Sequence, residues 1–264
     1  MLGVPIEDRA RFEVWVPALV RTNEPPQDVR EAAEVEEHGS QAAMQMKEYL
    51  RGLVATRRDR PGRDDLISAL VMATTSNDDD DAGQMNEEEL LASLQLLLIA
   101  GYETTVNLIT NSMLTLLRHP DVLARLRRDP DMVTRTVEEV LRYEPPVHYI
   151  SRTTLADINI AGVAIPKGAD VMLLLASGSR DPARFPDPDR FDPDRTDNEH
   201  LGFGRGIHYC VGAPLARMET HIALNALLRR LVNPRLVTDP PSYRELASLR
   251  GPQHLVVAFD HIGD

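Results

Sequence analysis

The only cysteine of the chain, Cys210, is the residue whose position most clearly suggests chemistry. It stands just before a predicted helix that begins near Pro214, where unpaired backbone N–H groups and the positive end of the helix dipole favour a thiolate over a thiol. Gly204, Gly206 and Gly212 permit a tight loop whose amides can approach the sulfur closely. Such a thiolate could act as a nucleophile, as a zinc ligand or as the axial ligand of a haem.

Several alternatives lack the residues that they need. Zinc requires three further ligands, and His208 is the only nearby candidate, with no C-x-x-C pair in the chain. A dinucleotide-binding loop fails because Ile207 stands where the third glycine belongs, and no Lys-Ser/Thr pair follows for a P-loop. A cysteine hydrolase would need a histidine base, and no recognisable motif places one. A lone cysteine is usually a buried and inert residue. The residues around Cys210 must therefore show whether it has a chemical role.

Those neighbours form a specific motif. Residues 203–217 read FGRGIHYCVGAPLAR, which resembles the F-G-x-G-x-H-x-C-x-G-x-x-L-A-R pattern of the haem-binding loop of the cytochrome P450 monooxygenases. Upstream, residues 100–105 (AGYETT) look like the oxygen-activation segment of that family, and residues 139–142 (EVLR) look like its E-x-x-R motif. Residues 188–191 (PDRF) resemble its meander element. All four motifs stand in the family order, and the similarity is strongest to bacterial soluble members.

The resemblance implies a haem b cofactor whose iron takes Cys210 as its axial ligand. His208 and Arg152 match positions that bind the haem propionates, since two buried carboxylates need cationic donors. The full set of cofactor-binding residues that it implies, besides Cys210, is Ala100, Gly101, Arg152, Phe203, Gly204, His208 and Gly212.

The resemblance also assigns catalytic residues in the central helix. Ala100 and Gly101 would leave room above the haem iron for dioxygen. Without the resemblance, Gly101 would be interpreted as a small residue that the helix tolerates. Glu103 and the Thr104 hydroxyl would relay protons to the oxygen. A thiolate ligand is a strong electron donor, which favours cleavage of the O–O bond.

Glu139 and Arg142 lie three residues apart on one predicted helix face. In isolation, such residues most often form a surface ion pair that contributes about 0.2–0.5 kcal/mol. The resemblance instead implies a buried charge network, in which Arg190 of the meander joins the pair and supports the cysteine loop. Breaking one partner of such a network would strand a buried charge, at a cost of about 3–5 kcal/mol.

The elements that position these residues are predicted from periodicity. Helices are expected over residues 7–20, 28–60, 64–73, 86–117, 120–128, 132–143 and 214–231, with Asn86 and Glu89 as a capping pair. Short strands are expected over residues 150–154, 158–160, 163–165 and 255–259, and residues 181–197 are expected to be ordered but irregular. The run of like charges at residues 76–81 predicts a solvated loop. The alternative is calcium binding, which is disfavoured because the spacing does not match an EF-hand loop.

Composition excludes several classes of protein. The chain has 264 residues, 42% hydrophobic and 27% charged, which is enough for a substantial core and argues against disorder. A net charge of −12 argues against broad binding to nucleic acids or anionic membranes. The apolar residues 90–109 include Glu103 and Asn107, which a bilayer span tolerates poorly. With a single cysteine and no signal peptide at its start, the chain is expected to be cytoplasmic.

We therefore expect a mainly α fold with small β-sheets, resembling a cytochrome P450 that lacks its N-terminal helices and part of its sheet. Residues 1–264 are expected to form a single domain that is the C-terminal portion of this fold, because residues 1–5 look like the end of a helix well inside a typical member. The implied function is a haem-thiolate monooxygenase that inserts one atom of O2 into an apolar small molecule. Its electrons would come from a ferredoxin-type donor with an NAD(P)H-dependent reductase. The alternative is a truncated, noncatalytic remnant that folds poorly or binds haem without turnover.

Overall fold

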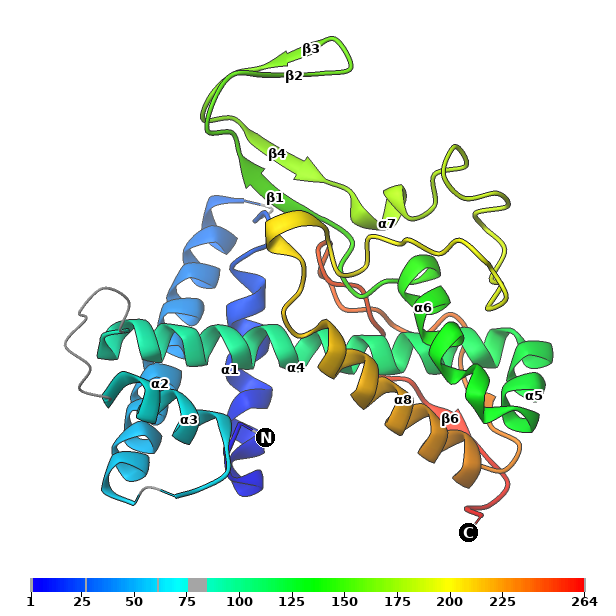
Figure 1. Cartoon of the computed structure of the whole chain (residues 1–264), viewed down its shortest axis with the longest axis horizontal. Helices are drawn as coiled ribbons and strands as arrows, with labels where there is room; N and C mark the ends of the chain where they lie inside the picture. The colour runs from blue at the N-terminus through cyan, green and yellow to red at the C-terminus, as the bar shows by residue number, and fades with distance from the viewer. Residues whose placement is uncertain (1, 27, 61, 76–84, 264) are drawn as a thin grey trace. The chain divides into compact units, whose positions relative to one another are not determined.

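The computed structural model describes residues 2–26, 28–60, 62–75 and 85–263, and the acidic run at residues 76–81 lies outside them. The described residues form mainly helices with small two-stranded sheets, as predicted. The chain packs as two compact units, residues 1–103 and 104–264. The long helix α4 (Glu87–Arg118) begins in the first unit and ends in the second (Figure 1). A single domain over the whole chain stays a prediction.

The first unit is helical. It contains a 3-10 turn (Ile6–Asp8), α1 (Arg9–Arg21), α2 (Val29–Asp59), α3 (Leu66–Thr75) and the start of α4. α1 packs against α2 through a cluster of aromatic rings, in which Phe12 lies 5.4 Å from Trp15 and 5.6 Å from Tyr49 between ring centroids.

Side chains cap the N-termini of two of these helices. Asp28 caps α2 by accepting a hydrogen bond from the backbone N–H of Glu31 at 2.8 Å. At the start of α4, Asn86 accepts from the N–H of Glu89 at 3.0 Å, and Glu89 accepts from the N–H of Asn86 at 2.8 Å. The predicted capping pair is therefore confirmed as a reciprocal capping box.

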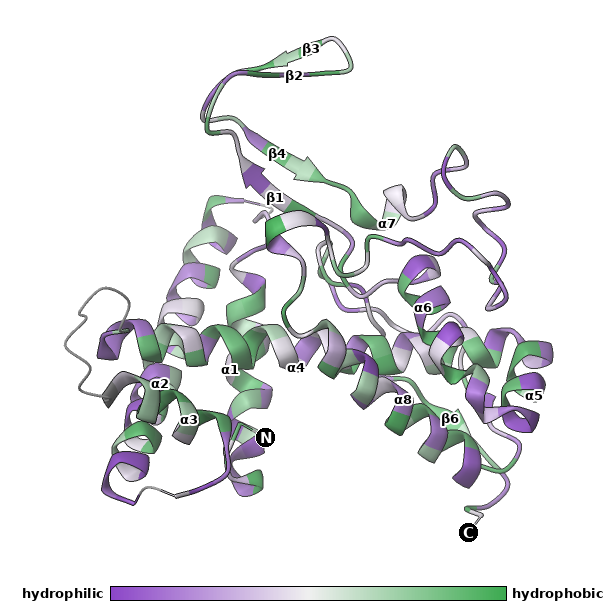
Figure 2. Ribbon diagram, in the orientation of Figure 1, coloured by the Kyte–Doolittle hydropathy of each residue, from purple (hydrophilic) through white to green (hydrophobic). Residues whose placement is uncertain are grey.

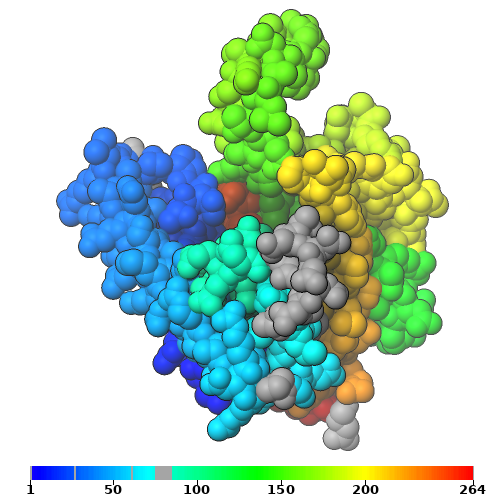
Figure 3. All heavy atoms as spheres, turned by 60° about the vertical axis from the view of Figure 1, so that its left-hand side comes forward, coloured from blue at the N-terminus to red at the C-terminus, as the bar shows by residue number. Residues whose placement is uncertain are grey.

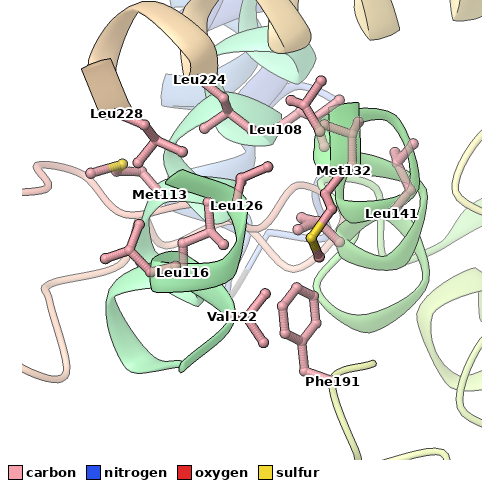
Figure 4. Packing of buried hydrophobic residues seen from close by; sticks show 14 residues of the cluster. Leu108, Met113, Leu116, Val122, Leu126, Met132, Leu141, Phe191, Leu224 and Leu228 are labelled. Atoms are coloured by element: carbon pink, nitrogen blue, oxygen red, sulfur yellow. The ribbon is translucent and has the colours of Figure 1, made fainter. Parts of the chain in front are cut away.

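The second unit is built on four helices. After the end of α4 come α5 (Pro120–Arg128), a 3-10 turn (Pro130–Met132), α6 (Val133–Tyr143) and later α8 (Ala213–Arg230). Hydrophobic and hydrophilic residues share each of these helices, as Figure 2 shows. The apolar faces meet in one core cluster (Figure 4) that includes Leu108, Met113, Leu116, Val122, Leu126, Met132, Val137, Leu141, Phe191, Leu224 and Leu228. This core includes residues of α6 and of α8, the helix that directly follows the cysteine loop.

The strands of the second unit form short antiparallel pairs. β1 (Ile150–Thr153) pairs with β4 (Asp170–Leu173), and β2 (Ile158–Ile160) pairs with β3 (Val163–Ile165). Figure 3 shows this region, in light green, projecting from the second unit. β5 (Arg235–Leu236) pairs with β6 (Val257–Ala258), so the closing strand predicted at residues 255–259 is present but shorter.

Besides β5 and the 3-10 turns, two further elements of the second unit were not predicted from the sequence. β4 and the short helix α7 (Leu175–Gly178) overlap an apolar run, residues 171–176, that has neither strand nor helix periodicity. The segment at residues 181–197 contains no regular helix or strand and is held by turns, as predicted. Among the described helices of both units, none combines the length and the apolar character that crossing a membrane requires.

Candidate active site around Cys210

Cys210 is held in a tight loop that leads into α8. Gly204 and Gly206 adopt φ angles of 69° and 70°, a left-handed backbone conformation that favours glycine. The Cys210 N–H donates to the carbonyl of Phe203 at 3.0 Å, and the N–H of Ala213 donates to the carbonyl of Cys210 at 3.2 Å. The backbone of the cysteine is therefore fixed at both of its polar groups, three residues before the first turn of α8.

Cys210 is exposed, so it is not a buried core cysteine. Exposed apolar side chains stand beside it, with Ile207 98% and Val211 88% accessible. Among the described residues, no three His, Cys, Asp or Glu side chains cluster closely enough to hold a metal ion. A haem fits this donor set, because its iron needs only one protein sulfur and its flat apolar ring would cover the uncovered side chains.

The two residues predicted to bind the propionates lie in the same unit as Cys210. His208 is exposed in the short 3-10 turn Gly206–His208. Arg152 is half-buried in β1 opposite Val171, and its Nη1 donates to the carbonyl of Ser151 at 2.8 Å. Within the part of the chain that the structure describes, neither forms an ion pair with a protein carboxylate. Both side chains can therefore donate hydrogen bonds to a carboxylate that is not part of the protein.

Glu139 and Arg142 form a buried ion pair within α6. Both side chains are 0% exposed, and Arg142 Nε and Nη2 donate to the two carboxylate oxygens at 2.8 Å each. Arg142 also donates to three backbone carbonyls beyond the helix, those of Ser179 at 3.2 Å, Pro188 at 2.8 Å and Arg190 at 3.0 Å. One guanidinium thus joins α6 to the irregular segment that precedes the cysteine loop.

The prediction that the Arg190 side chain completes this pair is wrong. That side chain is 68% exposed and points to Asp192, 3.5 Å away, while only its backbone carbonyl contacts Arg142. Arg195 takes the expected place, with its side chain 11% exposed and Nε 3.6 Å from Glu139 Oε2. The segment contains the triplet Pro-Asp-Arg twice, at residues 188–190 and 193–195, and only the path of the backbone distinguishes the two arginines.

The carboxylate of Glu139 is also satisfied by the irregular segment. The N–H of Asp192 donates to Oε1 at 2.9 Å, and Asn198 Nδ2 donates to Oε2 at 3.2 Å. Together with the two bonds from Arg142, this buried carboxylate accepts four hydrogen bonds. Such saturation is what a buried ion needs to be tolerated.

The predicted oxygen-activation residues Ala100, Gly101, Glu103 and Thr104 lie in a continuous stretch of α4. The division between the two units falls between Glu103 and Thr104. Glu103 is buried, with 3% of its surface exposed. The roles of these four residues stay predictions.

A second carboxylate of α6 was not singled out from the sequence. Arg217 Nε and Nη2 donate to the two oxygens of Glu138 at 2.6 and 2.9 Å, and His200 Nε2 lies 3.1 Å from Oε2. Burial alone would raise the pKa of Glu138, but the bonds from Arg217 and His200 outweigh it and lower that pKa to about 2. The available signals were the arginine that ends the cysteine motif and the paired glutamates at residues 138–139.

Comparison with known proteins identifies similar chains. A model of the family described as Cytochrome P450 matches residues 30–258. The "Biotin biosynthesis cytochrome P450" of Bacillus subtilis is 40% identical over 260 residues, which cover 98% of this chain and 63% of the relative. "Cytochrome P450 monooxygenase PikC" of Streptomyces venezuelae is 45% identical over 242 residues, 91% of this chain and 54% of the relative.

Solved structures agree with these matches. The crystal structure of P450BioI in complex with hexadec-9Z-enoic acid ligated acyl carrier protein has a TM-score of 0.88 and 41% identity, and the match covers 98% of this chain and 64% of that one. The predicted fold class is thereby confirmed. The chain spans 54% to 64% of the length of these relatives.

Proposed function

Because this chain belongs to the cytochrome P450 family, we propose that it carries the haem-thiolate site of a monooxygenase that inserts one oxygen atom of O2 into an apolar small molecule. The observation that carries the proposal is the exposed Cys210 thiol in its glycine-containing loop. A lone, accessible sulfur with a fixed backbone and uncovered apolar neighbours suits a ligand that approaches from outside the loop.

The proposed cofactor is haem b, held by residues of the second unit. Cys210 Sγ would ligate the iron, and the side chains of His208 and Arg152 would bind the propionates. Phe203, Gly204 and Gly212 would shape the loop beneath the ring. When bound, the haem supplies the electron transfer and the oxygen chemistry, which no protein side chain can provide.

The proposed contribution of α4 is proton delivery. The overall reaction consumes O2, two electrons and two protons, and it returns one hydroxylated substrate and one water. The Glu103 carboxyl would hold a proton away from bulk water, and Thr104 Oγ1 would pass that proton on toward the oxygen. Ala100 and Gly101, with the smallest side chains available, would leave space for O2.

The substrate and the electron donor are proposed by chemical class. The names of similar solved structures mention a hexadecenoic acid on an acyl carrier protein and testosterone, two apolar carbon skeletons of different shape. We therefore propose an apolar substrate without choosing between skeletons. A ferredoxin-type protein with its NAD(P)H-dependent reductase would supply electrons, and the cytoplasm would keep the thiol of Cys210 reduced.

A carbon monoxide spectrum of the haem-reconstituted full chain tests the proposal. The reduced wild-type protein should show the red-shifted Soret band of a thiolate-ligated haem, and C210A should lose it. Retention of the same band in C210A would contradict the assignment of the ligand. A soluble wild-type protein that shows no such band with haem supplied would favour the noncatalytic remnant instead.

A further inference from the structure

Helix α6 presents two consecutive carboxylates to different parts of the second unit. Glu139 binds the irregular segment, as described above, whereas Glu138 binds Arg217 of α8 through two hydrogen bonds at 2.6 and 2.9 Å. His200 supports the same carboxylate from the chain just before the cysteine loop, and its side chain is only 5% exposed.

His200 is itself oriented by the loop. The N–H of Gly202 donates to His200 Nδ1 at 3.0 Å, so Nδ1 acts as an acceptor and Nε2 carries the proton that faces Glu138. Glu138 therefore receives donors from both sides of the cysteine loop, from residue 200 before it and from residue 217 after it.

The guanidinium of Arg217 also contacts the loop directly. It lies over the Phe203 ring, 4.5 Å from the centroid, and Nη1 donates to the Tyr209 hydroxyl at 3.3 Å. The Phe203 and Tyr209 rings pack edge to face at 6.3 Å. Phe203 supplies the carbonyl that accepts the Cys210 N–H, and Tyr209 precedes Cys210 in the chain. A single guanidinium therefore touches both the residue that accepts the Cys210 N–H and the residue that directly precedes Cys210.

We propose that Arg217, held by Glu138 and His200, is a positioning residue that fixes the loop of Cys210 in the geometry needed for axial ligation of the haem iron. This inference rests on the proposed function. Arg217 does not touch the reacting atoms and acts through Phe203 and Tyr209. Its planar fork binds one carboxylate with two parallel bonds while its face stacks on a ring, a combination that lysine cannot reproduce.

The chain offers a matched control for this clamp. Arg184 binds Asp197 through two hydrogen bonds at 2.7 and 2.8 Å and lies 5.1 Å from the Phe185 ring centroid, so it has the same kinds of contact. The Arg184 and Asp197 side chains are 40% and 63% exposed, more than those of Arg217 and Glu138. None of the described contacts of Arg184 reaches residues 200–217. Arg184 also lies 3.5 Å from Glu199, which pairs with the exposed Arg205 of the loop, so its link to the loop is indirect and solvent-exposed. R184A therefore removes an equivalent pair without removing a direct contact to Phe203, Tyr209 or Cys210.

The test uses the full chain of the wild type, R217A, R217K, E138Q and R184A, with two readouts. The first is the ratio of the red-shifted to the unshifted Soret band in the reduced carbon monoxide complex, at equal haem content. The second is hydrogen exchange of the Cys210 amide in the full chain before haem is added, which reports the bond to Phe203 without any cofactor.

We expect R217A and E138Q to lower the band ratio at least fivefold and to speed exchange of the Cys210 amide about tenfold, the effect of losing one hydrogen bond to a charged group. R217K should fall between R217A and the wild type, and R184A should match the wild type within twofold. Wild-type ratios and wild-type exchange in R217A would overturn the inference.

Two further outcomes are decisive. If R217A fails to fold, R217K replaces it, and a wild-type ratio and wild-type exchange in R217K would overturn the clamp. If the wild type itself shows no red-shifted band, the proposed function fails on that readout. Exchange of the Cys210 amide then still tests the clamp, since unchanged exchange in R217K and E138Q would reject it separately.

Discussion

Removing the carboxylate of Glu139 is the most demanding test of how the second unit supports its cysteine loop. The substitution E139A leaves the Arg142 guanidinium fully buried beside three backbone carbonyls but without its counter-charge. It also removes the acceptor for the N–H of Asp192 and for Asn198 Nδ2.

The magnitude follows from burial. Both partners are 0% exposed, so solvent screens neither charge, and breaking a buried pair by deleting one partner costs about 3–5 kcal/mol. A domain is stable by roughly 5–15 kcal/mol in total, so this loss is a large share. E139Q should cost nearly as much, because its NH2 group would face the same set of donors.

The assay is urea unfolding of the full chain at pH 7, followed by far-UV circular dichroism and extrapolated linearly to water. E199A is the control, since Glu199 is 64% exposed and pairs with the exposed Arg205, and it should change the free energy of unfolding far less. Losses below about 1 kcal/mol for both E139A and E139Q, the size of a surface ion pair, would refute a structural role for this buried pair.

Three further predictions concern single residues. T104A should keep haem binding but produce less product per O2 consumed, measured with an oxygen electrode and product analysis; unchanged coupling would count against the proton relay. R195A should lower the free energy of unfolding by about 1–3 kcal/mol, because its 11%-exposed side chain binds backbone carbonyls and faces Glu139, whereas R190A should have little effect; equal losses in urea melts would contradict the assignment. The Glu138 pKa is lowered from 4.5 to about 2, so its ionised form stabilises the fold above pH 4.5, and this contribution is lost as the pH falls toward 2. The stability difference between wild type and E138Q should therefore shrink over that window, and a difference that stays constant would show that the carboxylate charge is not responsible.

The elements of this chain that depend on neighbours in sequence could be predicted from the sequence. Helix α5 was predicted with both ends correct, since Pro120 begins it and its last turn is basic. The capping box at Asn86 and the hairpin strands at residues 158–160 and 163–165 were also predicted, because they too depend on residues close in sequence. Each involves atoms only a few residues apart, so the pattern of residue types contains the whole interaction.

The motif around Cys210 could also be read directly, because its glycines, histidine and cysteine have fixed spacing in one short loop. It identified the family and the candidate ligand. Its spacing alone could not show that the thiol is exposed, or that Arg217 at the end of the motif turns toward Glu138.

The remaining features depend on residues far apart in the chain. Arg190 and Arg195 sit in the same Pro-Asp-Arg triplet, and only the folded path of the segment brings Arg195 to Glu139 and turns Arg190 toward solvent. β4 becomes a strand because β1 pairs with it, since its own apolar run has no period. The sequence by itself determined which residues could ligate a haem and form the charge network, and only the tertiary structure decided which of them meet, because an ion pair or a strand pair needs a partner whose position no local pattern specifies.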